Sequence, residues 1–543
     1  MSGTWPLAVP VSASHEMESA PASPTTNSLD MEVEMASLPR GVALLQGVAK
    51  QSGASSKEFL YRLSVLLLTY LSYTAYHASR KPLSIVKNSR EFLDCSGGSC
   101  TSWFSQLNKT PEEEAHTVLG LLDTAYLVTY AICMFGSGLV AERIDLRIFL
   151  SVGMVLSGVT TMMFGLARPL GLHSLWYLVL VQVAAGVVQT SGWPGVVTVM
   201  ANWFGKGKRG LIMGVWNSHT SIGNILGALV AGAFVNSNWG LAFIIPGLLT
   251  SCVGVILYLF LVPEPSVVGL STPRSSSHRA DSPSLSQSSS SSRLLDLNEI
   301  SSEGEETKLL RPEPSGQAIG FCTALRIPGV VEFSLCLFFA KLVSYTFLFW
   351  LPNYIASTTG LDAHSSAKLS TFFDVGGIIG GVIAGIISDR SGMSATTCAG
   401  MLVAAVPTLL CYQASLDWCP LNHVSGLPII DNCYFVTTLL LIISGLLVNG
   451  PYALITTAVS AELGTHRSLA GSSKALATVT AIIDGTGSAG AAVGPLLAGW
   501  LAGGGAWQRV FTMLVIADLL ALLLLARLMK REVRRCFRRR FSF

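Results

Sequence analysis

The sequence predicts an all-α membrane protein with twelve transmembrane helices arranged in two six-helix halves. Charged residues make up only 12% of the 543 residues, about half of the roughly 25% typical of soluble proteins. Charge-free stretches recur, and residues 211–261 contain no Lys, Arg, Asp or Glu. A helix needs roughly 20 apolar residues to cross the hydrocarbon core, so repeated runs of this length indicate a polytopic membrane protein. The composition excludes a disordered chain, a coiled coil and a typical cytosolic enzyme.

The apolar runs fall into two equal sets separated by a polar stretch. They lie at about 60–79, 117–141, 147–167, 174–200, 209–234 and 241–262, and then at 329–357, 367–388, 395–415, 431–457, 470–499 and 507–528. We therefore expect a disordered cytosolic arm at 1–58, an N-terminal six-helix bundle at 59–262, a disordered cytosolic linker at 263–328, a C-terminal six-helix bundle at 329–529 and a basic cytosolic tail at 530–543. The polar composition of the arm and the linker buries too little apolar surface to fold.

A short motif occurs at the end of the second helix of both halves. In each copy a glycine is followed four residues later by an acid and then by arginine: Gly138, Glu142 and Arg143 in the first half, and Gly385, Asp389 and Arg390 in the second. This pattern resembles the loop motif of the major facilitator superfamily, whose two parallel halves are built from inverted three-helix repeats. The resemblance implies a transporter fold in which these residues serve the conformational change.

The distribution of basic residues predicts the orientation in the membrane. Lys and Arg concentrate in the loops after spans 2, 4, 8 and 10 and in the tail, whereas the opposite loops after spans 3, 5, 7, 9 and 11 hold only Arg168, Lys368 and Arg509. Cytosolic loops carry the excess of basic residues, so we expect both termini and the linker in the cytosol. The loop between spans 1 and 2 then lies on the other side of the membrane, where Asn108 in an Asn-Lys-Thr triplet is a candidate glycosylation site.

The sequence gives no sign of a metal, a cofactor or a nucleic-acid partner. Eleven cysteines are too few for a disulfide scaffold, and no CxxC or HExxH motif occurs. A net charge of +3 is too small for a generic nucleic-acid binder. The pairs Cys95/Cys100 and Cys419/Cys433 lie in loops on the non-cytosolic side, where they are either disulfides or free thiols.

Ionisable side chains at membrane depth are the candidate functional residues, because each cation there costs roughly 2.5–3.5 kcal/mol on insertion scales and needs a cavity or a partner. Arg80 and Lys341 belong to the first helices of the two halves and are expected to face each other across a pseudo-twofold axis. A dianionic phosphate fits between them. The candidate binding residues are Arg80, Lys81, Asn217, His219, Lys341 and Lys474, and the candidate gating or charge-balancing acids are Asp123, Asp374 and Asp484.

Structural explanations remain open for several of these residues. Arg80 and Lys81 lie at the predicted end of span 1, where basic side chains can extend to the membrane interface. Lys474 lies near the start of span 11 and is either pore-lining or interfacial. His219 is either a structural hydrogen-bond donor or part of a polar strip that faces the pore. Close helix packing is expected at glycines spaced by four residues, such as Gly223/Gly227 and Gly490/Gly494.

Longer segments resemble the organophosphate:phosphate antiporters of the major facilitator superfamily, and among them the sugar-phosphate exchanger family. They are Ser79-Arg80-Lys81-Pro82, Gly192-Trp193-Pro194, residues 202–209, Trp216–Thr220, residues 341–345 and residues 374–377. The resemblance covers about residues 58–530. It implies a protein of the endoplasmic-reticulum membrane that exchanges glucose 6-phosphate, or a related sugar phosphate, for inorganic phosphate.

The resemblance also implies roles for single residues. Arg80 matches the phosphate-binding arginine of the family's first helix, and Lys81 matches the lysine beside it. His219 matches the fifth-helix histidine of the bacterial glycerol-phosphate member. Lys341 stands where bacterial members carry a second arginine, and Lys474 stands where the liver-type exchanger has histidine. At position 341 a point charge thus replaces the bidentate fork of arginine.

Two other classes of function fit the same cationic cavity. A membrane enzyme acting on sugar phosphates would need a positioned acid, base or nucleophile, and the sequence contains no paired carboxylates and no catalytic Ser/His arrangement. A non-transporting sensor or scaffold of the same fold would bind sugar phosphates without flux. The expected partners are a sugar phosphate, inorganic phosphate and the lipid bilayer; the sequence leaves protein partners open.

Overall fold

The computed structural model describes residues 38–46, 54–87, 92, 112–141, 143–204, 209–270, 321–418, 428–464, 475–502 and 505–540. Every regular element in these ranges is helical. The predicted sites Asn108, Glu142 and Lys474 and the cysteines Cys95, Cys100 and Cys419 lie outside the described residues, as does the side chain of Cys433.

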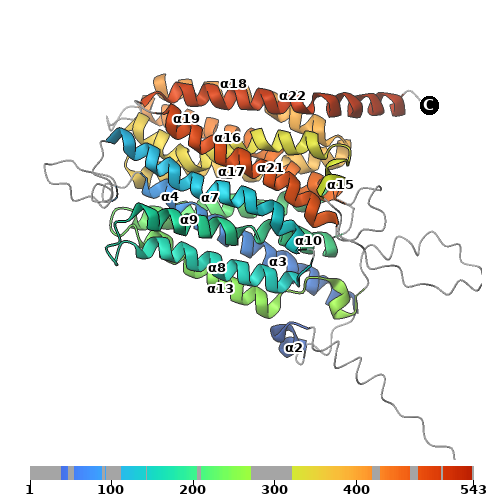
Figure 1. Cartoon of the computed structure of the whole chain (residues 1–543). Coiled ribbons are helices and arrows are strands. Elements are labelled where there is room, and N and C mark those ends of the chain that lie inside the picture. The colour runs from blue at the N-terminus through green and yellow to red at the C-terminus, as the bar shows by residue number, and fades with distance from the viewer. Residues whose placement is uncertain are drawn as a thin grey trace, which may run out of the picture. The chain divides into compact units, whose positions relative to one another are not determined.

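The N-terminal half is a bundle in which α8 packs on α9 and α13, while α3 packs on α12 and α13 (Figure 1). Its elements are α2 (Arg40–Gln46), α3 (Ala54–Arg80), α4 (Pro82–Val86), α7 (Glu112–Ala141), α8 (Leu146–Leu166), α9 (Leu175–Gln189), α10 (Gly192–Trp203), α11 (Arg209–Trp216), α12 (Ser218–Phe234), α13 (Leu241–Phe260) and the 3-10 turn η1 (Pro265–Val268). Thus α2 falls within the predicted arm, and η1 within the predicted linker.

The C-terminal half repeats this plan, with α16 packed on α21 and α22, and α19 packed on α17 and α18. Its elements are α15 (Phe321–Leu325), α16 (Val330–Thr359), α17 (Ala363–Ser391), α18 (Ser394–Trp418), α19 (Pro428–Leu454), a π-helical turn η2 (Ile455–Val459), α20 (Ser460–Leu463), α21 (Ala475–Leu501) and α22 (Trp507–Arg540). The helix α22 therefore continues through most of the predicted basic tail.

Ten helical segments of the described chain are long and apolar enough to cross a membrane. The two remaining predicted spans are helical as well: α3 takes the place of span 1, and α11 with α12 takes that of span 5. These two spans carry Arg80 and His219, and the second is interrupted at Asn217. Buried polar residues such as Thr69 and Asn224 contribute to the lower apolar content of these spans.

The end of the first span differs from the prediction. Pro82 has no N–H to continue the helix, so α3 ends at Arg80, but α4 carries the helical path on to Val86. Arg80 and Lys81 consequently lie within the bundle and are only 8% and 2% exposed. Their side chains do not extend to the membrane interface.

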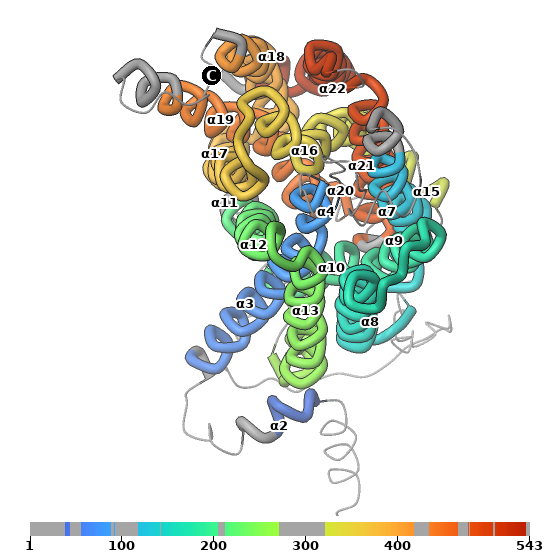
Figure 2. The backbone as a smooth tube through the Cα atoms, turned by 90° about the vertical axis from the view of Figure 1, so that its left-hand side faces the viewer, coloured from blue at the N-terminus to red at the C-terminus, as the bar shows by residue number. Residues whose placement is uncertain are grey.

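The two halves meet along two seams, α7 against α21 and α11–α12 against α17, with α4 beside α16 between them (Figure 2). Near the start of α11–α12, Gly214 lies close to the backbone of Gly381. Near its far end, His364 Nδ1 donates to the Gly232 carbonyl oxygen at 3.1 Å. The halves therefore touch at both ends of this seam, as expected of an occluded conformation.

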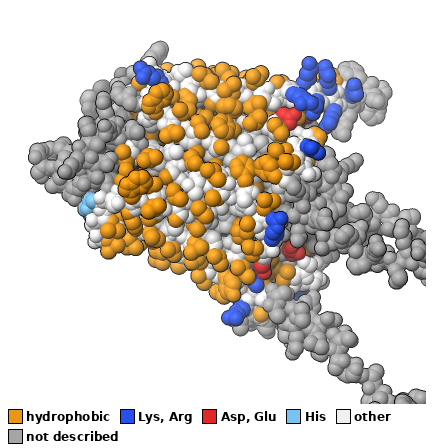
Figure 3. All heavy atoms as spheres, in the orientation of Figure 1, with side chains coloured by type: hydrophobic (Ala, Val, Ile, Leu, Met, Phe, Trp, Pro, Cys, Tyr) orange, Lys and Arg blue, Asp and Glu red, His pale blue; other side chains and the backbone are white. Residues whose placement is uncertain are grey.

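Hydrophobic side chains form a broad belt on the outer surface, and Lys and Arg gather at its edges (Figure 3). Leu180, Trp500 and Leu523 are among the exposed residues of this belt, at 64%, 76% and 69% exposure. The largest basic group in Figure 3 lies where α22 passes beyond the belt, and the basic residues of that segment whose side chains the structure describes are Arg527, Lys530, Arg531, Arg534, Arg535 and Arg538. This surface is that of a protein embedded in lipid.

Candidate functional site

Arg80 is the central cation of the interior. Its Nε donates to Gln189 Oε1 at 2.7 Å, and its Nη1 donates to the Tyr345 hydroxyl at 3.5 Å. The guanidinium also lies over the rings of Tyr130 and Tyr126, at 4.9 and 5.9 Å from their centroids. No described carboxylate forms an ion pair with Arg80, and its buried Nη2 has no hydrogen-bond partner among the described residues.

The orientation of Arg80 is fixed by neighbouring polar groups. The Tyr126 hydroxyl donates to the same Gln189 oxygen at 2.5 Å, and Gln189 Nε2 donates to Ser79 Oγ at 3.4 Å. These bonds hold the Gln189 oxygen towards the guanidinium. Hydrogen bonds of this kind, made by the partner of a charged group, keep that group in one orientation when a ligand binds.

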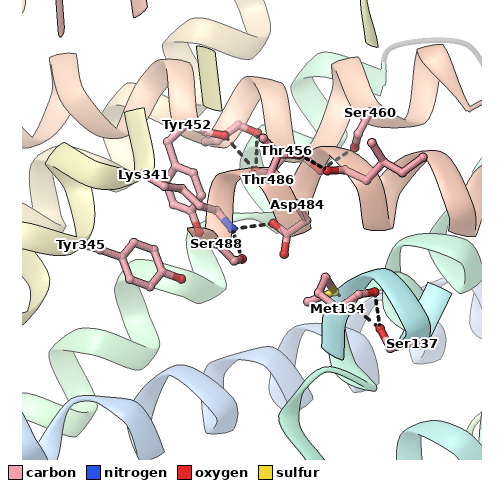
Figure 4. A network of polar contacts seen from close by, with 12 residues as sticks. Met134, Ser137, Lys341, Tyr345, Tyr452, Thr456, Ser460, Asp484, Thr486 and Ser488 are labelled. Carbon is pink, nitrogen blue, oxygen red and sulfur yellow. Dashed lines mark hydrogen bonds and ion pairs between the residues drawn. The ribbon is translucent and has the colours of Figure 1, made fainter. Parts of the chain in front are cut away.

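Lys341 is the second cation and lies in the middle of α16, as its apolar flanks predict. Its Nζ donates to Asp484 Oδ1 at 2.6 Å and to Ser488 Oγ at 3.3 Å, both on α21 (Figure 4). The ammonium lies 5.8 and 5.6 Å from the ring centroids of Tyr345 and Tyr452. Asp484 thus neutralises Lys341, in keeping with the charge-balancing position predicted for it.

Tyr345 connects the two cations. Its hydroxyl accepts a hydrogen bond from Arg80, and its ring lies beside Lys341. The structure therefore brings together the charged side chains from the first helices of the two halves, as the sequence predicts, with tyrosines between them.

Lys81 points away from this cluster, although it is adjacent to Arg80 in the chain. Its Nζ donates to the backbone carbonyl oxygen of Leu348 at 2.9 Å. That carbonyl lies four residues before Pro352, which is inside α16 and has no N–H to donate to it. Lys81 of one half thus supplies a donor to a helix of the other half. The sequence places Lys81 among the candidate binding residues, and in this conformation its ammonium contacts the other half instead of the cluster around Arg80.

Sequence reasoning overlooked Lys87, because the predicted first span ended before it. Lys87 is fully buried at the end of α4, where its Nζ forms an ion pair with Asp123 of α7. The same Nζ lies 4.4 Å from the ring centroid of Trp350 on α16. Asp123 therefore balances a charge, as predicted, but its partner is a lysine that the sequence pattern places in a loop.

His219 is fully buried within aromatic rings rather than facing the open interior. Its ring lies 4.5 Å from Trp216 and 4.9 Å from Tyr73 between centroids, and its Nδ1 contacts the Thr220 hydroxyl at 3.2 Å. Its Nε2 has no hydrogen-bond partner among the described residues. The neighbouring Asn217 does line a cavity. Sequence reasoning missed His77, which lines the same cavity from α3.

This cavity lies between the halves and contains about 420 Å³ of empty space. A chain of polar side chains crosses it: His77 Nδ1 contacts Asn224 Oδ1 at 3.2 Å, and Asn224 Nδ2 donates to Asp374 Oδ1 at 2.8 Å. Asp374 thus accepts a hydrogen bond from the opposite half of the protein. A second cavity of about 430 Å³ lies beside Arg80 and Gln189, lined mainly by the N-terminal half and closed by Phe349 of α16.

The repeated motif lies at the ends of α7 and α17. Gly138 and Gly385 are buried within these helices, whereas Arg143, Asp389 and Arg390 are exposed. Arg143 donates to the Leu139 carbonyl oxygen at 2.6 Å. The motif therefore lies at the surface, away from the buried cations.

The predicted glycine contacts are present. A Cβ at Gly227 would lie 2.6 Å from the Ala78 carbonyl oxygen, and one at Gly490 would overlap the backbone of Phe338. The helix pairs α3/α12 and α16/α21 can approach this closely only because these residues lack a side chain.

Comparison with known proteins identifies close relatives. The family model described as Major Facilitator Superfamily matches residues 105–477 and 333–536. The chain is 50% identical over 511 residues to a Danio rerio protein named glucose-6-phosphate exchanger SLC37A2, a match that covers 92% of this chain and 97% of that protein. The Homo sapiens protein of the same name is 51% identical over 490 residues, covering 88% and 94% of the two chains.

A further relative is a Mus musculus protein named glucose-6-phosphate exchanger SLC37A1, 45% identical over 537 residues, with 92% and 97% of the two chains covered. Among solved structures, a bacterial homologue of the human lysosomal transporter Spinster in an inward-facing, unoccupied conformation matches with a TM-score of 0.55. It is 16% identical and covers 87% of this chain and 98% of its own. This likeness concerns the fold alone.

Proposed function

The chain belongs to the major facilitator superfamily and, within it, to the sugar-phosphate exchanger family, and we propose that it exchanges glucose 6-phosphate for inorganic phosphate by alternating access. Its relatives are named as exchangers, and its fold is that of transporters rather than enzymes. The counter-substrate and the endoplasmic-reticulum membrane are part of this proposal.

The uncompensated charge of Arg80 carries the proposal. Lys341 is ion-paired with Asp484 and Lys81 donates to a backbone carbonyl oxygen, whereas Arg80 has an Nη2 without any partner among the described residues and no described carboxylate as ion-pair partner. A buried charge without a counter-ion costs several kcal/mol, so a site of this kind favours an anion. A phosphate offers several acceptor oxygens, and the free Nη2 edge of Arg80 can donate to one of them.

We assign the remaining residues by their surroundings. Lys341 contributes a second positive charge to the phosphate, and its attraction is moderated by Asp484. Lys81, bound to the Leu348 carbonyl oxygen, and Asp374, bound to Asn224, join the two halves, and Lys87, which is paired with Asp123 of its own half, contacts Trp350 of the other. Asn217 lines the cavity next to this cluster, while His219 supports it through Thr220 and the surrounding rings. Lys474, which lies outside the described residues, is assigned to substrate binding, as in the sequence analysis.

Exchange rather than one-way transport follows from the same charge. Closing the protein around Arg80 without an anion would bury its charge without compensation, so return of the unloaded carrier is slow. Loading with either phosphate or a sugar phosphate removes this cost. The two halves then rock about the central site, using the close contacts along the seams formed by α11–α12 with α17 and by α7 with α21.

The orientation is proposed from the surface charge. The last part of α22 carries eight basic residues: Arg527, Lys530, Arg531, Arg534, Arg535, Arg538, Arg539 and Arg540. Because basic residues concentrate on the cytosolic side, we place this end of α22 and the N-terminus in the cytosol.

Reconstitution of the purified protein into phosphate-loaded liposomes tests the proposed function. Wild-type protein should take up labelled glucose 6-phosphate only when phosphate is present inside. Arg80→Gln should lower this exchange roughly 30-fold or more, since truncating one partner of a buried, hydrogen-bonded charge pair costs roughly 2–5 kcal/mol. The control Arg509→Gln removes an arginine exposed on α22 and should exchange normally.

Two results would contradict the proposal. Full exchange by Arg80→Gln would remove Arg80 from the phosphate site. Binding of glucose 6-phosphate by the wild-type protein without any phosphate-dependent uptake would instead indicate a sensor or scaffold.

A further inference from the structure

The last part of α22 continues past the hydrophobic belt and beyond the ends of the neighbouring helices (Figure 1). We propose that this projecting segment, residues 527–540, is a docking surface for an acidic part of the chain's own linker, residues 296–306. The contact lies away from the buried cations and is independent of the exchange function.

The projecting segment presents most of its positive charge along one side of the helix. The exposed basic side chains that the structure describes are Arg527, Lys530, Arg531, Arg534, Arg535 and Arg538. Most of them follow one another at spacings of three or four residues, which places them on one face. Among these six, only Arg527 forms an ion pair with a described carboxylate, that of Glu332 at 3.5 Å. The charge of this face is therefore largely uncompensated within the described part of the chain.

Another side of the same segment is fastened to the protein. The Glu532 carboxylate accepts hydrogen bonds from the backbone N–H groups of Ala395 and Thr396 at 3.0 and 2.8 Å, and from the Thr396 hydroxyl at 2.8 Å. These N–H groups belong to the first turn of α18 and have no carbonyl partner within that helix. Glu532 thus holds α22 against α18 while the basic face stays exposed. A surface held in place in this way loses little freedom when a partner binds.

The linker contains a segment of the opposite charge. Residues 296–306 include five acids and no Lys or Arg, and the acids are Asp296, Glu299, Glu303, Glu305 and Glu306. The projecting segment holds eight basic residues and one acid, Glu532. Each exposed ion pair contributes little, but several pairs that form together add up to a measurable attraction.

The acidic segment can reach this surface. The structure describes the chain up to Leu270 and again from Phe321 in α15, which packs on α16. The first turn of α16 carries Glu332, the partner of Arg527, so the linker rejoins the described chain close to the base of the projecting segment. Glu306 precedes Phe321 by 15 residues, which span up to about 50 Å when extended. A short tether gives an effective concentration in the millimolar range, so even a weak contact is populated.

The length of the projection favours the linker over anionic lipid headgroups. Leu523 of the belt is 69% exposed, and Arg538 follows it by 15 residues, about 22 Å along the helix axis. The Debye length is only about 8 Å at physiological ionic strength. Lipid headgroups therefore attract the base of the segment and hardly its outer turns, whereas a soluble acidic segment can lie along its whole length.

Spin labels on the full-length protein test the contact. One label is placed on the native Cys536, which is exposed and, two residues from Arg534, lies on the other side of the helix. The second is placed on Ser302→Cys, and the other cysteines are replaced by serine. In neutral detergent at about 0.1 M salt, the distance distribution should contain a short component. At about 1 M salt, where the Debye length falls from about 10 to 3 Å, its share should drop about 5-fold or more. Absence of the short component at low salt would overturn the docking.

Reversal of charges identifies the two partners. Combining Arg534→Glu with Arg538→Glu should lower the share of the short component about 5-fold, whereas the matched control that combines Arg534→Lys with Arg538→Lys should preserve it. Adding Glu303→Lys and Glu306→Lys to the reversed α22 should restore the short component. A reversed α22 that keeps the short component, or a swapped protein that fails to regain it, would contradict the proposal.

Measurement in nanodiscs separates the linker from lipid as the partner. The short component should be as large in nanodiscs that contain phosphatidylserine as in nanodiscs of phosphatidylcholine alone. Its loss in the phosphatidylserine nanodiscs alone would show that anionic lipid occupies the basic face, and the linker would be ruled out as its partner in such a membrane.

Discussion

The bond from Lys81 to the Leu348 carbonyl oxygen should stabilise the closed arrangement of the halves, because it joins α4's N-cap to α16. Lys81→Met removes the donor while keeping an unbranched side chain. Closing the halves then buries a carbonyl that receives no N–H from Pro352 within its own helix. Leaving a buried acceptor unsatisfied costs about 1–3 kcal/mol, which corresponds to roughly 5- to 150-fold in the closed-to-open ratio.

Removal of the lysine also removes the cost of burying its charge, so Lys81→Met alone does not isolate the hydrogen bond. Pro352→Ala restores an N–H that can donate to the Leu348 carbonyl oxygen within α16. In that background Lys81→Met should disfavour closure by about 1–3 kcal/mol less than it does in the wild type. The double-mutant cycle therefore measures the coupling between Lys81 and the proline-freed carbonyl.

Spin labels on Asn236→Cys and Lys368→Cys can report the populations, in a background without the other reactive cysteines. Both positions are exposed, and they lie on opposite halves near the contact between Gly232 and His364. Distance distributions then give the closed fraction for each of the four proteins in the cycle. Effects that add to within about 0.5 kcal/mol would refute the reasoning.

Three further predictions concern single contacts. Asp484→Asn should destabilise the detergent-purified protein by roughly 3–5 kcal/mol, because it leaves Lys341 unpaired. Combining Lys341→Met with Asp484→Leu should restore the thermal midpoint of unfolding but not the exchange activity. A double variant as unstable as Asp484→Asn would contradict this. Gly490→Ala should lower the thermal midpoint and the free energy of unfolding, the latter by about 1–3 kcal/mol, because the added methyl group overlaps the Phe338 backbone. A thermal midpoint equal to that of Gly400→Ala, where an added methyl group meets nothing within 4 Å, would contradict the packing argument. Asp362 caps α17, and the hydrogen bond with the Ser365 side chain, followed by those from the backbone N–H groups of Ser365 and His364, lowers the pKa of its carboxyl. The stabilisation by the Asp362 carboxylate is therefore complete above the ordinary pKa of aspartate and is lost as the pH falls through the lowered pKa. Amide hydrogen exchange in the first turn of α17 should be faster in Asp362→Ala than in the wild type at neutral pH, and similar in the two proteins in acid.

The cation cluster could be predicted because charges in apolar runs stand out in a sequence. Lys341 has apolar or weakly polar neighbours on both sides, and Asp484 lies in another such run, so burial and mutual compensation follow from composition alone. The two-half architecture follows in the same way from the repeated runs and the duplicated motif. These inferences use only the cost of charge in lipid and the length of a membrane-spanning helix.

The directions of neighbouring side chains could not be predicted. Arg80 and Lys81 are consecutive, yet Arg80 faces Tyr345 and Lys81 reaches Leu348, because the break at Pro82 and the packing on α16 decide where each points. Lys87 was missed since a charge next to a polar loop resembles an interfacial residue. The direction of each of these side chains depends on packing between distant segments, about which the hydrophobic periodicity of the sequence carries no information.

The contacts of the buried cations differ in one respect that bears on the transport cycle. Lys341 and Asp484 lie on α16 and α21, which are packed backbone to backbone within one half, so their salt bridge travels as a rigid unit when the halves move. The bonds of Arg80 to Tyr345 and of Lys81 to Leu348 join different halves and have to break and re-form in every turnover. Arg80, the last residue of α3, and Lys81, the N-cap of α4, therefore couple anion binding to the movement of the halves.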